Sequence, residues 1–184
     1  IYTVKLTVNG TNYTQPLTVR MDPRVKTPPA GLTQQFTLSK QMYDGMLETQ
    51  AALLELRAIR AQVKPLQEKA GQGAVFQALS AFDQKAAALE GGGGGPGGQR
   101  GGGGGGAGGG GPDTLAGIGS SLSSLMSLMQ GADAAPTSQV VAAVGERRQA
   151  LASLMAKWNT FKTQELASLN SQLKAANLPP IEIK

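Results

Sequence analysis

The chain has 184 residues and a formal net charge of +5, and 40% of its residues are hydrophobic but only 4% are aromatic. Cysteine and histidine are absent, which excludes disulfides, thiol nucleophiles and metal sites built from thiolate or imidazole ligands. Basic residues do not cluster or alternate with aromatic ones, and no apolar run is long enough to span a bilayer, so we predict no nucleic-acid partner and no membrane span.

The first residues predict a β-hairpin. Tyr2, Val4, Leu6 and Val8 alternate with polar residues, as in a strand with one buried face. Asn9-Gly10 can adopt the positive φ angles of a tight turn. Tyr13, Leu17, Val19 and Met21 then share one face of a second strand, and Pro16 on the other face places this strand at a sheet edge.

A two-stranded ribbon with one apolar face is marginal in water, so this hairpin needs a cover. The downstream helices are one candidate. The pattern is also that of the last two strands of an Ig-like or fibronectin-like sandwich. We favour this second interpretation, in which residues 1–22 are the end of a truncated sandwich. A chain that starts at Ile1 rather than Met is also expected to be a fragment or a processed product. The proline-rich residues 23–31 are predicted to be a linker.

Residues 32–90 are predicted to form a first pair of helices. Pro65 interrupts the helical pattern, and the subsequent "EKAGQG" predicts a turn into a second helix at residues 74–89. The first helix carries a broad apolar arc, which predicts contact with more than one neighbour. That arc consists of Phe36, Met42, Tyr43, Met46, Leu47, Leu53, Leu54 and Leu56.

Residues 114–178 are predicted to form a second pair of helices, with residues 179–184 as a C-terminal tail. Thr137 is suited to cap the last helix, and Pro179-Pro180 ends it. One apolar stripe runs along that helix, as in a helix packed along one side of a bundle. The stripe consists of Val140, Val144, Leu151, Leu154, Met155, Trp158, Phe161, Leu169 and Leu173.

The predicted fold is therefore mainly α: an up-and-down bundle of about four helices, with neighbours antiparallel, preceded by the hairpin. Residues 91–113 hold most of the chain's 26 glycines and are predicted to be a disordered loop between the two helix pairs. Because the cost of loop closure grows slowly with length, the bundle is expected to tolerate a shorter loop.

No catalytic, cofactor or metal site is predicted. The glycine tract matches G-x-G-x-x-G only as any glycine run does, without a preceding strand or a GK[ST] sequence. Asp44, Glu48, Glu55, Glu68 and Asp83 are candidates for acid/base pairs or cation ligands. Basic residues lie near most of them along the sequence, so solvated helix faces are the favoured interpretation.

Three further features each have a functional and a structural interpretation. Met126 and Met129 suit an adaptable binding groove, but their helical spacing with neighbouring leucines favours core packing. Trp158 lies at the centre of its stripe and is interpreted as a core residue rather than a ligand-stacking one. The sequons at Asn9 and Asn12 bear on function only in a eukaryotic secretory context.

Three passages carry a family resemblance: the hairpin "YTVKLTVNGTNYTQPLTVRMDPRV", the helix "ALLELRAIRAQV", and the segment from "GADAAPT" to "LPPIEI". Together they resemble the C-terminal region of large bacterial BNR/Asp-box repeat proteins. These are secreted β-propellers that are often described as sortilin-like, sialidase-like or glycosyl hydrolases. The likeness covers nearly the whole chain except the glycine tract, which departs from it as an expanded loop.

The resemblance implies a position downstream of a propeller and an Ig-like domain, in an extracellular or periplasmic protein whose signal peptide lies upstream. The Asp-box sequence S-x-D-x-G-x-T-W does not occur here, so no glycosidase residue can be assigned to this chain. We expect a non-catalytic structural or interaction module that contacts these upstream domains, a protein partner or another copy. The alternative is an accessory part of an exo-acting glycoside hydrolase whose active site lies upstream.

Overall fold

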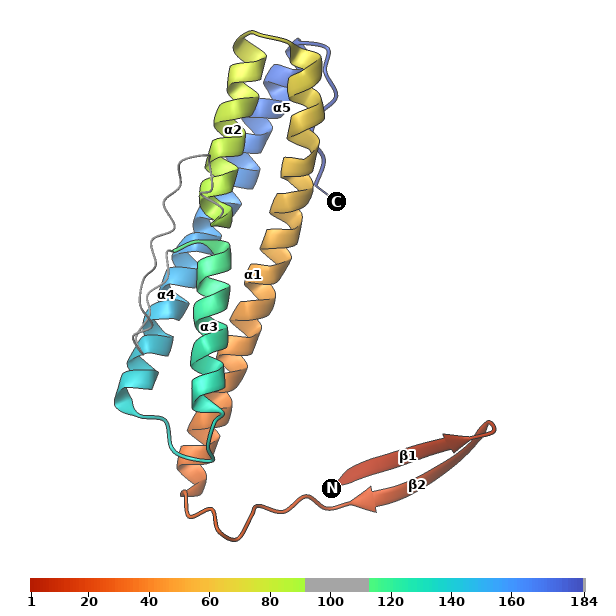
Figure 1. Cartoon of the computed structure of the whole chain (residues 1–184), viewed down its shortest axis with the longest axis vertical. Coiled ribbons are helices and arrows are strands. Elements are labelled where there is room, and N and C mark those ends of the chain that lie inside the picture. Colours follow the sequence, from red (N-terminus) through yellow and green to blue (C-terminus); the bar gives the residue numbers. More distant parts are fainter. Residues whose placement is uncertain (92–112, 184) are drawn as a thin grey trace.

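The hairpin forms as its sequence predicts. The computed structural model describes residues 1–91 and 113–183. Strand β1 (Tyr2–Val8) pairs antiparallel with β2 (Thr11–Leu17), and Asn9 (φ 48°) and Gly10 (φ 80°) make the turn (Figure 1). The predicted second strand was too long, since residues 18–22 lie outside it. Tyr2 already pairs with Leu17, so β1 has almost no residues left to pair with residues beyond Leu17.

Helix α1 (Pro29–Ala70) is a single element of 42 residues. It begins inside the predicted linker 23–31, because proline fits the first turn of a helix, where its missing N–H is not needed. It also continues through Pro65, between the buried residues Val63 and Leu66, whose packing holds the helix together. Gly71, at φ 64°, then ends it at the predicted turn.

Helices α2 (Ala74–Glu90) and α3 (Leu115–Met129) pack against α1 one after the other, α2 along its C-terminal part and α3 along its N-terminal part. Hydrogen bonds join Ser80, Asp83 and Glu90 of α2 to Gln67, Arg60 and Arg57 of α1, in that order. Nearer the start of α1, α3 takes over: Gly119 lies against Thr49, Leu122 against Gly45, and the Met129 carbonyl accepts a hydrogen bond from Gln35. Both helices therefore run antiparallel to α1, one after the other.

The two ends that flank residues 92–112 are adjacent. A Cβ atom placed on Gly91 would lie 2.5 Å from Thr114 Oγ1. Gly91 has the left-handed conformation of a helix C-cap, and Thr114 caps α3 by accepting a hydrogen bond from the Gly117 amide. Helices α2 and α3 thus form one interrupted rod. The loop predicted over residues 91–113 falls mostly outside the described residues.

The last rod consists of α4 (Ser138–Thr160), the π-helical turn η1 (Phe161–Glu165) and α5 (Leu166–Ala175). Thr137 caps α4 as predicted, accepting a hydrogen bond from the Val140 amide. This rod runs parallel to α1, since Leu151 lies near Gly45 and Lys162 pairs with Glu55 further along. The tail turns back onto α1, where Gln62 exchanges two hydrogen bonds with the Glu182 backbone.

Over residues 1–91 and 113–183 the fold is mainly helical, and it has four helices, as predicted, when the continuous segment α4–η1–α5 is counted as one. The predicted alternation of four antiparallel neighbours is wrong. The helices form three rods: α1, then α2 with α3, then α4 with η1 and α5 (Figure 1). The two helices that flank the glycine tract run in the same direction along α1 instead of reversing. Four amphipathic segments do not by themselves specify a reversal at each connection, and that is why the error arose.

One hydrophobic core runs through the three rods. Its fully buried side chains include Met42 and Leu56 from α1, Leu79 from α2, Leu122 from α3 and Leu173 from α5. The buried hydrophobic residues include none from positions 1–28, so the core closes without the hairpin. The predicted tail is part of this core, because Ile181 is buried and Asn170 bonds both its amide and its carbonyl.

Candidate functional site

The hairpin exposes one apolar face. The strand register places Leu6 opposite Tyr13 and Tyr2 opposite Leu17, with Val4 and Val8 on the same side. We call these six residues, Tyr2, Val4, Leu6, Val8, Tyr13 and Leu17, the hairpin face. Each of them is between 46% and 67% exposed. The valine and leucine side chains are of types that are most often buried, and tyrosine is enriched in strands.

The opposite face of the hairpin is polar. Thr3, Lys5 and Thr7 of β1 lie there with their β2 partners, and the Thr7 hydroxyl donates a hydrogen bond of 2.7 Å to Asn12 Oδ1. A strand pair that is apolar on one side and polar on the other is built to cover a core. The hairpin therefore has the amphipathic pattern of a sheet edge, with its apolar side in water.

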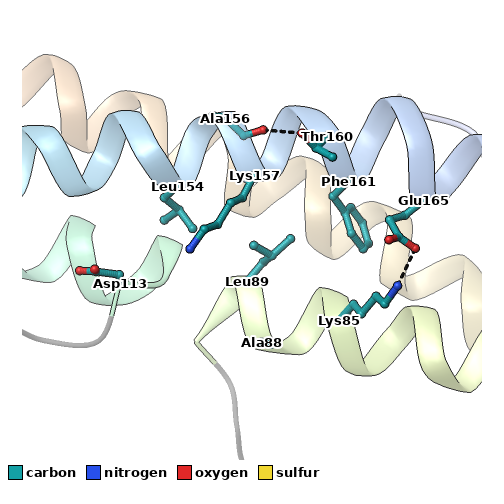
Figure 2. A pocket seen from close by; sticks show the side chains of 10 residues that line it. All are labelled: Lys85, Ala88, Leu89, Asp113, Leu154, Ala156, Lys157, Thr160, Phe161 and Glu165. Carbon is teal, nitrogen blue, oxygen red and sulfur yellow. Dashed lines mark hydrogen bonds and ion pairs between the residues drawn. The ribbon is translucent and has the colours of Figure 1, made fainter.

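A groove of about 580 Å³ opens between α4 and the junction of α2 with α3 (Figure 2). Leu89, Leu154 and Phe161 form its apolar walls, and ion pairs stand at both ends. At one end Lys85 Nζ lies 2.8 Å from Glu165 Oε2. At the other end Asp113 Oδ1 lies 3.3 Å from Arg147 Nη1. The groove therefore has an apolar centre and charged ends.

Lys157 extends into this groove from α4, toward the gap between Leu89 and Asp113 (Figure 2). No ion-pair partner for its ammonium group occurs among residues 1–91 and 113–183. The two carboxylates of the groove, in contrast, both face cations of the chain itself. The groove thus offers an accessible cation above an apolar surface, and neither carboxylate is left free as an acid/base group.

The π-helical turn shapes one wall of the groove. In a continuous α-helix Glu165 would follow Phe161 on the core side, because residues four apart share a face. Instead the Leu166 amide bonds the Phe161 carbonyl, five residues back, so Leu166 turns into the core and Glu165 turns toward Lys85. Phe161 itself stacks on Phe82, with ring centroids 4.6 Å apart.

Two arginines of α1 hold the end of α2. Arg60 lies between Asp83 and Glu90, and Arg57 also bonds Glu90. Burial alone would raise the pKa of Glu90, but the hydrogen bonds from Arg57 and Arg60 outweigh it and hold that pKa below its ordinary value. The pKa of Arg60 is raised, chiefly by its hydrogen bond to Asp83. This cluster fastens α2 next to residue 91.

The five carboxylates singled out in the sequence do not gather into one site. Asp44 pairs with Lys40, Glu55 with Lys162 and Asp83 with Arg60, while Glu48 and Glu68 lie apart and exposed. No group of three acidic side chains positioned to hold a metal ion occurs within the described ranges. The prediction of solvated helix faces fits Asp44, Glu48 and Glu68, which are exposed, but not Glu55 and Asp83, which are partly buried and pair with basic residues of other helical segments.

The other residues singled out in the sequence lie in the core or on the hairpin. Trp158 is 2% exposed, which confirms its assignment to the core, and the Lys162 ammonium lies 5.0 Å from its ring centroid. Met129 is buried and Met126 packs against the core. Asn9 and Asn12 lie on the exposed hairpin. The glycine run that matches G-x-G-x-x-G lies almost entirely outside the described residues.

The groove with Lys85, Lys157 and Glu165 was not predicted from the sequence. One signal for it was available. From Leu151 to the end of the last helix, apolar residues recur every three or four positions, but Phe161 and Leu166 are five apart, which is the spacing of a π-turn. No local sequence pattern predicted that the ends of α2 and α3 meet, because a long glycine-rich segment separates them in the sequence.

Comparison of the chain with protein-family models, curated proteins and solved structures gives no match. Among the described helices, none combines the length and the apolar character needed to cross a bilayer.

Proposed function

We propose that this chain is a non-catalytic structural and interaction module of a larger secreted bacterial β-propeller protein of the BNR-repeat type. In this proposal the hairpin supplies the last two strands of an Ig-like sandwich, and the helical rods form a terminal module after it. The observation that carries the proposal is the exposed hairpin face, with its six large side chains on one side of a regular strand pair.

The occupant of the hairpin face in this proposal is a second β-sheet. Apolar faces of sheets pack against one another about 10 Å apart, with side chains interdigitated, and the alternation of Tyr2, Val4, Leu6 and Val8 suits that packing. The rods are a poorer candidate, because their core is closed without any residue from positions 1–28. The residues upstream of the hairpin in the parent protein are therefore the proposed source of the sheet.

The groove in Figure 2 supports a non-catalytic role for this segment. A glycosidase site needs two carboxylates in different protonation states, and both groove carboxylates face a basic side chain. The alternative function, an accessory part of an exo-acting glycoside hydrolase, assigns the chemistry to upstream residues. Turnover of chromogenic glycosides by the present chain alone would contradict both functions.

Site-specific labelling tests the proposed sheet contact. The chain contains no cysteine, so Leu6→Cys on the hairpin face and Lys5→Cys on the polar face each provide one attachment point for an environment-sensitive fluorophore. In the present chain both labels should report water. In the full-length parent protein the label at position 6 should shift to the blue, while the matched label at position 5 should shift less.

Three results would overturn the proposal. A label at position 6 that is already shielded in the present chain would mean that its own helices cover the hairpin face. A label at position 6 that stays in water in the full-length protein would mean that no upstream sheet covers it. Near-equal shifts at positions 5 and 6 would indicate burial of the whole hairpin, which a terminal strand pair of a sandwich does not undergo.

A further inference from the structure

The two strands of the hairpin have different outer edges. In an antiparallel pair, residues that exchange backbone hydrogen bonds with the residue opposite alternate with residues whose N–H and C=O groups point away from the partner strand. A two-residue turn makes the pair that flanks it a hydrogen-bonded one, and here that pair is Val8 with Thr11. The register then fixes which backbone groups of each strand point outward.

The outer edge of β1 is complete. Thr3, Lys5 and Thr7 lie at the positions that are not hydrogen-bonded to β2, so each directs one N–H and one C=O outward. We call their N–H groups the outward β1 amides. Within the described part of the chain, no backbone hydrogen bond from outside the hairpin reaches these three residues. Strand β1 therefore presents an uninterrupted row of donors and acceptors.

The outer edge of β2 is interrupted. Asn12, Thr14 and Pro16 lie at the corresponding positions of this strand. Proline has no N–H, so β2 lacks an outward donor at residue 16, and only Asn12 and Thr14 supply outward β2 amides. The proline removes no bond between the two strands, because its position is one that does not bond β1. A proline placed in this way protects an edge against the addition of a further strand.

We propose that a third strand of the same sheet pairs with the outer edge of β1, and that β2 is the terminal strand of that sheet. This inference rests on the proposed function, because the third strand is a segment of the parent protein upstream of residue 1. Its backbone bonds the outward groups of β1, and its apolar side chains extend the hairpin face. A sheet of three strands with one apolar face can be stable where a two-stranded ribbon is marginal.

A second copy of this chain is a poorer occupant of the same edge. Two β1 strands that pair antiparallel over their full length place Lys5 of one copy directly opposite Lys5 of the other, since Lys5 is the central residue of β1. Like charges directly opposite each other destabilise a strand pair. The edge therefore suits a strand that carries a polar or acidic residue opposite Lys5.

Amide hydrogen exchange at single-residue resolution tests the proposal. In the present chain the outward amides of both strands should exchange fast, because all of them face water. In the full-length parent protein the outward β1 amides should exchange at least about tenfold more slowly, while the outward β2 amides stay fast. The comparison is internally controlled, since both strands belong to one hairpin and share its overall stability.

A matched pair of proline substitutions sharpens the test. Lys5→Pro removes one outward β1 amide, and Thr14→Pro, at the position opposite, removes one outward β2 amide. In the present chain both variants should keep the cross-strand nuclear Overhauser contacts of Leu6 with Tyr13, because Pro16 already occupies such a position. In the parent protein Lys5→Pro should speed exchange of the remaining outward β1 amides at least about tenfold, and Thr14→Pro should not change it. If a proline unfolds the hairpin, exchange in the unsubstituted protein still decides the question.

Three exchange patterns in the parent protein would overturn the proposal: slow outward amides on β2 instead of β1, slow outward amides on both strands, or fast ones on both. Equal effects of Lys5→Pro and Thr14→Pro on the outward β1 amides would also overturn it. The fluorophore at position 6 reports on the proposed function separately. A blue shift there with fast exchange at both edges would refute the third strand and leave the cover of the hairpin face intact. A label that stays in water would refute the proposed function whatever the exchange pattern.

Discussion

The hairpin and the helical rods use similar side chains and reach opposite outcomes. Leu6 on β1 is 60% exposed, although its strand pair has a complete register and a well-formed turn. Leu56 on α1 is 0% exposed and lies in a core shared by all three rods. Backbone pairing alone thus forms the hairpin, whereas side-chain burial is what stabilises the rods.

The difference shows that local regularity and stability are separate properties. Each strand residue can satisfy its backbone by pairing, but a net hydrogen bond adds only about 1 kcal/mol, which does not offset the conformational entropy of ordering the chain. The rods gain the additional burial of whole leucine side chains, at about 1.5–3 kcal/mol each. The hairpin obtains that gain only if another surface covers its face.

The largest expected effect compares the two leucines directly. Leu56→Ala should lower the free energy of unfolding by about 2–5 kcal/mol, because it removes buried methyl groups and leaves a cavity. Leu6→Ala should change it by less than about 0.5 kcal/mol, as expected for an exposed position. Trp158 is the only tryptophan and is buried between the rods, so its fluorescence during urea unfolding reports both variants.

Equal losses for Leu6→Ala and Leu56→Ala would break the comparison, because they would mean that the hairpin contributes to the same core. A hairpin contribution of that kind would also contradict the proposed upstream cover. Far-UV circular dichroism of the folded variants serves as the control that neither substitution has melted a helix before denaturant is added.

The sequence predicted the features that depend on nearby residues. The Asn9-Gly10 turn, the Thr137 cap and the core position of Trp158 were correct, since turn chemistry, capping and a narrow apolar stripe are local properties. The path of α2 and α3 was not predicted. Their common direction is set by contacts such as Arg60 with Asp83 and Thr49 with Gly119, which join positions far apart in sequence.

The candidate sites follow the same rule: features set by nearby residues were predicted, and features set by contacts distant in sequence were not. Alternation in β1 identified the hairpin face, because a period of two is visible in seven residues. The groove beside η1 depends on a single five-residue spacing and on the meeting of α2 with α3, so the pattern over one helix did not reveal it. The exposed apolar residues of α1, such as Phe36 and Leu54, were merged with the core arc, since apolar residues on different sides of one helix look like a single broad arc in sequence.

Acid should act on the rods and spare the hairpin. Residues 1–21 contain no carboxylate, whereas Glu90 holds α2 to Arg57 and Arg60 of α1. Because the pKa of Glu90 is lowered in the folded state, its contribution is complete above its ordinary value of 4.5 and is lost as the pH falls through the lowered pKa. Glu90→Gln should therefore cost about 1–2 kcal/mol at about pH 7 and progressively less once the pH falls below that ordinary value.

Urea unfolding at about pH 7, 5 and 3 measures this dependence. Glu68→Gln is the control, because Glu68 is exposed and has no ion pair within the described residues, and it should leave the midpoint unchanged at every pH. A difference between wild type and Glu90→Gln that stays constant across this range would show that the two arginine contacts do not stabilise the charged form of Glu90.

The smallest expected effect compares glycine-to-alanine substitutions in the two regions, one of which should raise stability while the other lowers it. Gly10 has φ 80° and Gly145 lies inside α4, yet a Cβ added at either would meet no atom within 4 Å. Gly145→Ala should raise the stability of the rods by about 0.5–1 kcal/mol, because alanine loses less entropy in a helix. Gly10→Ala should instead weaken the hairpin by about 1 kcal/mol through its positive φ alone, with no change in the Trp158 transition.

Cross-strand nuclear Overhauser contacts between Leu6 and Tyr13 monitor the hairpin separately. If Gly10→Ala moved the rod transition as far as Gly145→Ala does, the two regions would unfold as one unit, and their separate stabilities would have to be abandoned.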